Sequence, residues 1–425
     1  TATYLSGGYS GIPRVARNLS HQASATSRGD LQVIPVIWAG RFGFIAPNWL
    51  PSARPPFWLR WVITITEGFR YIALFAKRRS RDSASKTCEH AEFISLRGRD
   101  FYPWRRGIAR LAGRPIDLGP DDAIVLLDTM GARTALVKEI SSARATHGTK
   151  CGLLIHDLFP IHRPEMCTPQ TVADFRAYLN DFLPQADFFV ANSETTRLNI
   201  ENYLNTQPNQ LQIRGDSFRL GASISDDAYL ERNQRQRKTF KDLPSVTGFI
   251  LLAVGTIEPR KNYPILLDAF DRLRESLDIT LCIVGRPGWK TDDVMARLNN
   301  HPCIGQQLRY FPDADNTLLY SLFQQADALI CASIDEGFGL PVAEGLHAGL
   351  PVLASDIPIF REIGGEHIRY FSPHSSESLA LTINQVAADA VNSSHEPAFK
   401  SPRPVSWAES SHDFVKKAET LAWPL

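Results

Sequence analysis

Two glutamates, separated by seven residues, stand in a glycine-rich stretch of this 425-residue chain. Glu336 follows a predicted buried strand, 328–332, and Glu344 lies one turn inside the helix expected after the loop. Pro341 suits the first helical position, and Gly349 suits the position after the last one. Because helical side chains lean toward the helix N-terminus, Glu344 can reach back to the mouth where Glu336 lies.

This mouth could bind a phosphorylated sugar. The free N–H groups of Gly339 and Leu340 mark a helix N-terminus, which attracts phosphate. Glycines let the backbone approach a ligand closely, and a carboxylate accepts hydrogen bonds from paired hydroxyls. A plain strand-helix-strand crossover, with glycines for turns and exposed glutamates, explains the same residues without a ligand.

Three further residues stand where strands are predicted to end. Arg260 and Lys261 follow an apolar strand and precede a helix, so that together they could bind an anion. Basic residues on an exposed loop are the alternative. His156 follows the predicted strand 151–155, at the edge where open α/β sheets bind ligands. A capped structural histidine is the alternative there.

Composition indicates a soluble globular protein rather than a nucleic-acid binder. Lys and Arg number 46 against 45 Asp and Glu, so the net charge is +1 and no global basic field attracts nucleic acid. The six cysteines are scattered and form no C-x-x-C pair. Buried reduced thiols in a cytoplasmic protein are therefore expected.

The order of the predicted elements indicates two α/β domains in which strands and helices alternate. The charged run 231–241 predicts a solvated connection between them. We expect a first domain at 1–221, with an irregular insertion at 51–118, and a second at 247–400. The tail, 405–425, is predicted to be helical.

The segment 57–81 interrupts this alternation. Its apolar and aromatic residues, followed by a basic end, predict a helix. Three charged residues at Arg60, Glu67 and Arg70 argue against a helix that spans a membrane. The helix could lie in a membrane interface, or it could pack on its own domain or on a second subunit.

These motifs resemble a known enzyme family. Residues 336–344 resemble the E-x7-E signature of retaining GT-B glycosyltransferases, and E-G-F-G-L-P at 336–341 is close to glycosyltransferase family 4. H-D-L-F-P at 156–160 is similar to its mannosyltransferase-type members, and E-P-R-K-N at 258–262 to its diphosphate loop. Thr256 departs from the pattern, since many members carry Arg there.

The resemblance implies α/β architecture of the GT-B type, with two Rossmann-like domains facing an interdomain cleft and the last helix packing back on the first domain. The residues implied to be catalytic are Glu336, His156, Arg260 and Lys261. The residues implied to bind the sugar nucleotide are Gly11, Arg260, Lys261, Gly337, Phe338, Gly339, Leu340 and Glu344.

The implied reaction transfers a hexose, with mannose from GDP-mannose favoured, to a hydroxyl of a glycan or lipid-linked glycan with retained configuration. No metal or other cofactor is expected, because Asp313 and Asp315 are predicted to cap the following helix rather than bind a metal. A cytoplasmic location, with peripheral contact at the inner membrane face through 57–81, is expected. The alternatives are a UDP-sugar-dependent transferase, a nucleotide-sugar epimerase or a phosphorylase on the same fold, and a non-enzymatic nucleotide- or glycan-binding scaffold.

Overall fold

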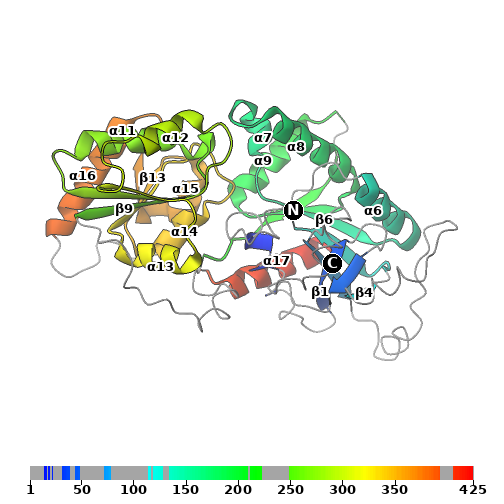
Figure 1. Cartoon of the computed structure of the whole chain (residues 1–425). Coiled ribbons are helices and arrows are strands. Elements are labelled where there is room, and N and C mark those ends of the chain that lie inside the picture. Colours follow the sequence, from blue (N-terminus) through cyan, green and yellow to red (C-terminus); the bar gives the residue numbers. More distant parts are fainter. Residues whose placement is uncertain are drawn as a thin grey trace. The chain divides into compact units, whose positions relative to one another are not determined.

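The computed structural model in Figure 1 divides the chain into two compact units. The first contains Thr1–His156, Ala173–Gly221 and Trp407–Leu425, and the second contains Asp157–Val172 and Ala222–Ser406. Residues 157–172 therefore group with the second unit, although they lie inside the predicted first domain. The structure describes residues 14–16, 18–19, 22, 31–38, 44–47, 71–77, 113–115, 118–127, 134–208, 211–222, 248–392 and 405–424.

The second unit is built on a six-stranded sheet in which all strand pairs are parallel. Its strands are β9 (Phe249–Val254), β10 (Ile279–Val284), β11 (Leu308–Phe311), β12 (Ala328–Cys331), β13 (Val352–Ser355) and β14 (Ile368–Phe371). The spatial order β11-β10-β9-β12-β13-β14 is the doubly wound Rossmann order. The direction of winding changes between β9 and β12, and this switch point is where such sheets bind ligands.

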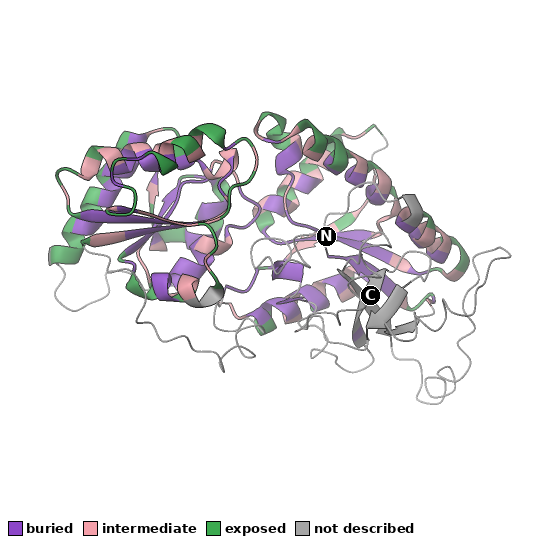
Figure 2. Cartoon of the chain, in the orientation of Figure 1, coloured by how far each residue is buried: buried purple, intermediate pink, exposed green. Residues whose placement is uncertain are grey.

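Helices cover both faces of this sheet. In Figure 1, α11 and α12 lie on one side of β9, and α13 and α14 lie on the other. The helices of the second unit, of which the short α7 does not lie on the sheet, are α7 (Phe159–His162), α11 (Tyr263–Leu273), α12 (Asp292–Asn299), α13 (Asn316–Gln325), α14 (Leu340–His347), α15 (Pro358–Gly364) and α16 (Ser376–Asn392). Every residue of β10, β12 and β13 is buried, as expected for continuous apolar runs in a parallel sheet (Figure 2).

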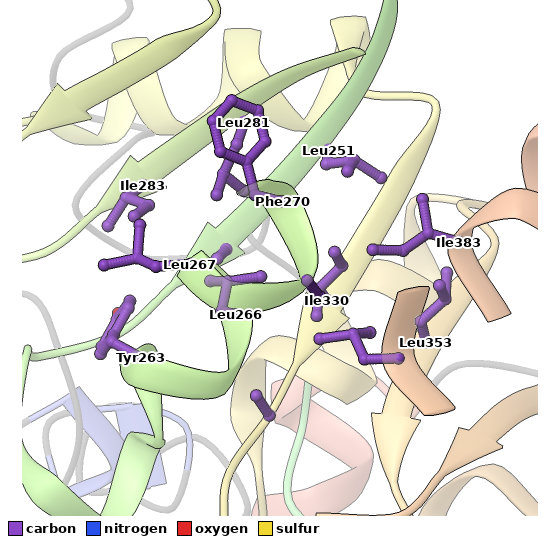
Figure 3. Close-up of a cluster of buried hydrophobic side chains, with 14 of the residues drawn as sticks. Leu251, Tyr263, Leu266, Leu267, Phe270, Leu281, Ile283, Ile330, Leu353 and Ile383 are labelled. Atoms are coloured by element: carbon purple, nitrogen blue, oxygen red, sulfur yellow. The ribbon is translucent and has the colours of Figure 1, made fainter. Parts of the chain in front are cut away.

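The core of the second unit lies between β9, β10, β12 and the inner face of α11. Figure 3 shows Leu266, Leu267 and Phe270 of α11 beside Leu281 and Ile283 of β10. These helical residues recur at spacings of one, three and four, so they share one face of α11. Their burial holds α11 against the sheet and fixes the loop that precedes it.

The first unit has a mixed eight-stranded sheet in the order β4-β2-β1-β3-β5-β6-β7-β8, of which β5 to β8 are parallel. Its strands are β1 (Leu31–Trp38), β2 (Phe44–Pro47), β3 (Tyr71–Lys77), β4 (Gly113–Pro115), β5 (Asp122–Leu126), β6 (Lys150–Ile155), β7 (Phe188–Ala191) and β8 (Arg214–Ser217). Its helices are α6 (Thr134–His147), α9 (Glu194–Thr206) and α17 (Trp407–Ala422), and α8 (Pro169–Phe182) begins in the second unit and ends in the first. Parallel strands with helical crossovers in both units confirm the predicted fold class of two Rossmann-like α/β domains.

The helix predicted across 57–81 was wrong where the structure describes this segment. Tyr71–Lys77 is the strand β3, which pairs antiparallel with β1 on one side and β5 on the other. A short continuous apolar run fits a buried strand as well as a segment of a buried helix, and periodicity does not distinguish the two. Residues 57–70 lie outside the described residues. Among the helices that the structure describes, none is long and apolar enough to cross a membrane.

The helix α17 packs on β6, β7 and β8 of the first unit. The ring of Phe414 lies 5.1 Å from that of Phe218, and Ser411 Oγ donates a hydrogen bond to Leu19 O over 3.3 Å. Trp407 at its start is fully buried. The last helix therefore completes the core of a unit whose other residues end at Gly221, before the second unit's Ala222–Ser406.

Candidate active site

The candidate site lies at the switch point of the second sheet, where the loops after β9 and β12 run side by side. The first loop contains a short 3-10 helix, Pro259–Lys261, and the second carries Ser333 and Glu336. Ile334 N donates to Arg260 O over 2.9 Å, which joins the two loops. The fold thus brings together residues that are 76 positions apart in the sequence.

Glu336 lies at the centre of this site and is 8% exposed. Its Oε2 accepts from Arg260 Nη1 over 2.6 Å. Its Oε1 accepts from Lys261 Nζ over 2.5 Å and from Ser333 Oγ over 2.8 Å. One carboxylate therefore contacts both of the cations that were predicted to form an anion site.

Arg260 is surrounded by carboxylates. Glu258 Oε1 lies 3.0 Å from Arg260 Nε and 2.8 Å from Nη2, and Asp157 Oδ2 lies 3.9 Å from Nη1. The guanidinium also lies 5.1 Å from the ring centroid of Phe159, a cation–π distance. We call Glu258, Arg260, Lys261 and Glu336 the ion cluster.

The charges of the ion cluster stabilise each other inside the protein. Burial alone raises the pKa of Glu336, but Arg260 and Lys261 outweigh burial and lower this pKa to about 2. Burial also disfavours a charged Arg260, yet Glu336, Glu258 and Asp157 outweigh it and raise the pKa of Arg260. Glu336 and Arg260 are therefore both ionised at neutral pH.

The helix α14 begins at Gly339, which adopts a left-handed conformation with φ of 86°. A Cβ atom there would lie 2.6 Å from Phe360, so both the backbone angle and the space favour glycine. The helix ends at Gly349, whose φ is 74°, with hydrogen bonds from Gly349 N to Leu346 O and from Leu350 N to Gly345 O. This Schellman pattern confirms that Gly349 ends the helix.

Glu344, the second glutamate of the motif, is 2% exposed inside α14. The carboxylates of Glu344 and Glu336 both raise the pKa of the Cys331 thiol, which lies at the end of β12. Burial is the main cause that raises the pKa of Cys331 to about 12, Lys261 lowers it, and Glu336 and Glu344 raise it further.

A cavity adjoins the ion cluster, with a polar wall of Lys261, Ser333 and Glu336 at the mouth of α14. Its remaining lining is mostly apolar and comes from β9, α11, β12 and the start of α14: Ala253, Val254, Tyr263, Leu266, Ile330, Cys331, Ala332, Gly339, Pro341 and Phe360. Lys261 and Glu336 are the charged residues of this lining.

The remaining predicted residues have different surroundings. Phe338 is buried beside the start of α14, and Gly337 lies in the same loop. His156 belongs to the first unit, where it is 3% exposed and its Nε2 lies 2.9 Å from Leu127 O. Gly11 lies outside the described residues. Asp315 Oδ1 accepts from Leu318 N over 2.8 Å, which confirms it as the cap of α13.

Three polar side chains that contact Arg260 or Glu336 were not predicted: Glu258, Ser333 and Asp157. Glu258 belongs to the E-P-R-K-N run and Asp157 to the H-D-L-F-P run, and other residues of both runs were predicted as site residues. A buried arginine needs a charged partner, and Glu258 is a carboxylate only two residues from Arg260 in the sequence. This proximity could have indicated that the two side chains pair.

Comparison with known proteins locates a family match in the second unit. Residues 234–400 match the family model of glycosyl transferases group 1. Among curated proteins, the chain is 32% identical over 321 residues to the serotype-specific mannosyltransferase WbdA of Escherichia coli. This match covers 73% of the chain and 38% of WbdA, so the chain spans well under half of that relative.

Two further matches are shorter or less identical. The O-antigen chain mannosyltransferase B of Escherichia coli is 32% identical over 32% of the chain and 36% of that protein. Among solved structures, Anabaena Alr3699/HepE in complex with UDP is similar, with 18% identity, a TM-score of 0.46, and coverage of 71% of this chain and 76% of that one. The matched family model is named for glycosyl transferases, and both curated relatives are named as mannosyltransferases.

Proposed function

We propose that this protein transfers a hexose from a sugar nucleotide to a hydroxyl of a glycan or lipid-linked glycan, with retained configuration. GDP-mannose is the favoured donor, because two of the similar proteins are named as mannosyltransferases. The observation that carries the proposal is the ion cluster at the switch point, with Arg260 and Lys261 beside the N-terminus of α14.

The diphosphate is the leaving group in the proposed reaction, and it gains negative charge as the glycosidic bond breaks. Arg260 and Lys261 would stabilise that charge, together with the N–H groups of Gly339 and Leu340 at the helix start. A contact that strengthens as charge develops lowers the barrier itself. In this proposal the protein supplies the positive charge, and no metal is required.

The two glutamates have separate proposed roles. Glu344 would accept hydrogen bonds from the ribose hydroxyls, and Glu336 would orient the sugar. Because Glu336 contacts both cations, its carboxylate and a donor diphosphate would use the same N–H groups. The proposed role of His156 in orienting the sugar is supported by the motif at 156–160 alone.

A donor screen tests the proposal. The protein is incubated with GDP-mannose or with UDP-hexoses, with and without a mannan oligosaccharide, and the products are analysed by mass spectrometry. A product heavier than the acceptor by one hexose, with release of GDP, is the expected result.

Two other results would contradict the proposal. Interconversion of the sugar on the nucleotide without an acceptor would identify an epimerase. Nucleotide binding without release or transfer, across all donors and acceptors, would indicate a binding scaffold.

A further inference from the structure

We propose that Glu258 is a positioning residue that orients the Arg260 guanidinium toward the donor diphosphate. The inference rests on the proposed function of Arg260 and adds a residue that the motif comparison did not select. Glu258 is 5% exposed, directly before the short helix that carries both cations.

The contact between the two side chains fixes the orientation of the guanidinium. Arg260 Nε donates to Glu258 Oε1 over 3.0 Å, and Nη2 lies 2.8 Å from the same oxygen as an ion pair, so one edge of the planar group is occupied. The other terminal nitrogen, Nη1, points to Glu336. An arginine held by one edge presents its free N–H groups in one direction, whereas an unsupported side chain would sample several rotamers.

The backbone of Glu258 is itself held in place by the loop after β10. Ile257 N donates to Arg286 O over 2.9 Å, and Gly288 N donates to Ile257 O over 2.8 Å. Lys261 N donates to Glu258 O over 3.0 Å, which closes the short helix. The backbone that carries the Glu258 carboxylate is therefore held in one position relative to Arg260.

Glu258 does not fit a direct contact with the donor. A carboxylate would repel a diphosphate. A buried charge is retained where it is paired, and Arg260 is the partner that it contacts. Any effect of Glu258 on the reaction should therefore pass through Arg260.

A double-mutant cycle tests this dependence. Turnover and the donor KM are measured for the parent, Glu258→Gln, Arg260→Ala and the double variant. We expect Glu258→Gln to lower kcat by about tenfold in the parent, and by less than about twofold where Arg260 is already absent, since coupled residues are not additive. An equal loss in both backgrounds, or no loss in the parent, would overturn the inference.

The same cycle is repeated on the affinity for GDP and for UDP by calorimetry, which needs no turnover. Coupling of at least about threefold between the two positions, in either direction, is expected. Absence of coupling with a measurable Arg260→Ala effect overturns the role of Glu258 alone. An Arg260→Ala variant with unchanged affinity and turnover overturns the proposed phosphate site as well.

The exposed residue Glu275, which pairs with Arg274 in the same unit, provides the matched control. Glu275→Gln removes the same charge away from the site and should leave all readouts unchanged. Thermal unfolding of Glu258→Gln checks that the variant is folded.

Discussion

The two units use the polar residues at their strand ends in different ways. In the first unit, His156 after β6 bonds to a backbone carbonyl, and Ser193 after β7 accepts from Thr196 N over 3.0 Å as the cap of α9. In the second unit, the side chains after β9 and β12 pair with one another as ions. Strand-end residues thus satisfy the backbone in one unit and hold charge in the other.

Sheet topology explains this difference. The second sheet changes its winding direction between β9 and β12, so two loops leave the same edge in opposite directions and leave space between them. In the first sheet, β5 to β8 follow one another in sequence and in space, and β3 lies on the other side of β5. We therefore expect substitutions at the ion cluster to act on chemistry, and substitutions at first-unit strand ends to act on stability.

The largest effect is expected at the cation pair. Lys261→Ala should lower turnover on the order of 10²- to 10³-fold, because it removes one donor that stabilises the leaving diphosphate. The donor KM should rise less than kcat falls. Steady-state kinetics with the sugar nucleotide measure both values.

The exposed residue Lys138 of α6 provides the control, and Lys138→Ala should retain full turnover. EDTA should change the activity of the parent little. Full activity in Lys261→Ala, or strict dependence of the parent on a metal, would contradict the proposal that the ion cluster of the second unit acts on the chemistry.

A smaller effect is expected at the second glutamate. Glu344→Ala should weaken binding of the free nucleoside diphosphate about tenfold, because a hydrogen bond to a charged acceptor is worth about 1.5–3 kcal/mol. Calorimetry with GDP measures the affinity. Glu366→Ala, at an exposed glutamate, is the control, and equal affinities in both variants would contradict the ribose role.

Substitution of His156 tests whether this strand-end residue of the first unit affects only stability or also turnover. His156→Ala should reduce stability by about 1–3 kcal/mol, since Leu127 O loses its partner. Ser193→Ala, which removes the cap of α9, should cost about 1 kcal/mol. If His156 also orients the sugar, its variant alone should lose turnover while keeping its GDP affinity. Equal turnover in the two folded variants would make His156 a structural residue only.

The smallest effect concerns acid stability. The pKa of Glu336 falls from 4.5 to about 2 on folding, so its contribution to stability is present above pH 4.5 and is lost as the pH falls toward 2. Urea unfolding between pH 5 and pH 2.5 should therefore show a shallower decline for Glu336→Gln than for the parent. Parallel declines would mean that the carboxylate is not held ionised by its cations.

Local sequence rules predicted the elements around the site well. β12, α14 and β13 were expected from an apolar run, a glycine-rich loop and a second apolar run, and Gly349 was expected as the helix end. The cap Asp315 was also predicted from residue type and position. These features depend on residues close in sequence, which is why a single sequence suffices for them.

Long-range pairing could not be predicted in the same way. β3 is a strand because β1 and β5 lie on either side of it, and the sequence of the segment alone does not contain this information. Likewise, the contacts of Glu258 and Glu336 with Arg260 depend on the packing of two distant loops. The motifs identified the charged residues, but not which of them neutralise one another.

The position of α17 also sets the order in which the chain can fold during synthesis. The ribosome completes every residue of the second unit before it makes Trp407 and Phe414, which fill the core of the first unit. The apolar face of the first unit that α17 covers therefore stays exposed until α17 has been synthesised. We expect this protein to depend on chaperones during that interval, because transiently exposed apolar surface promotes aggregation.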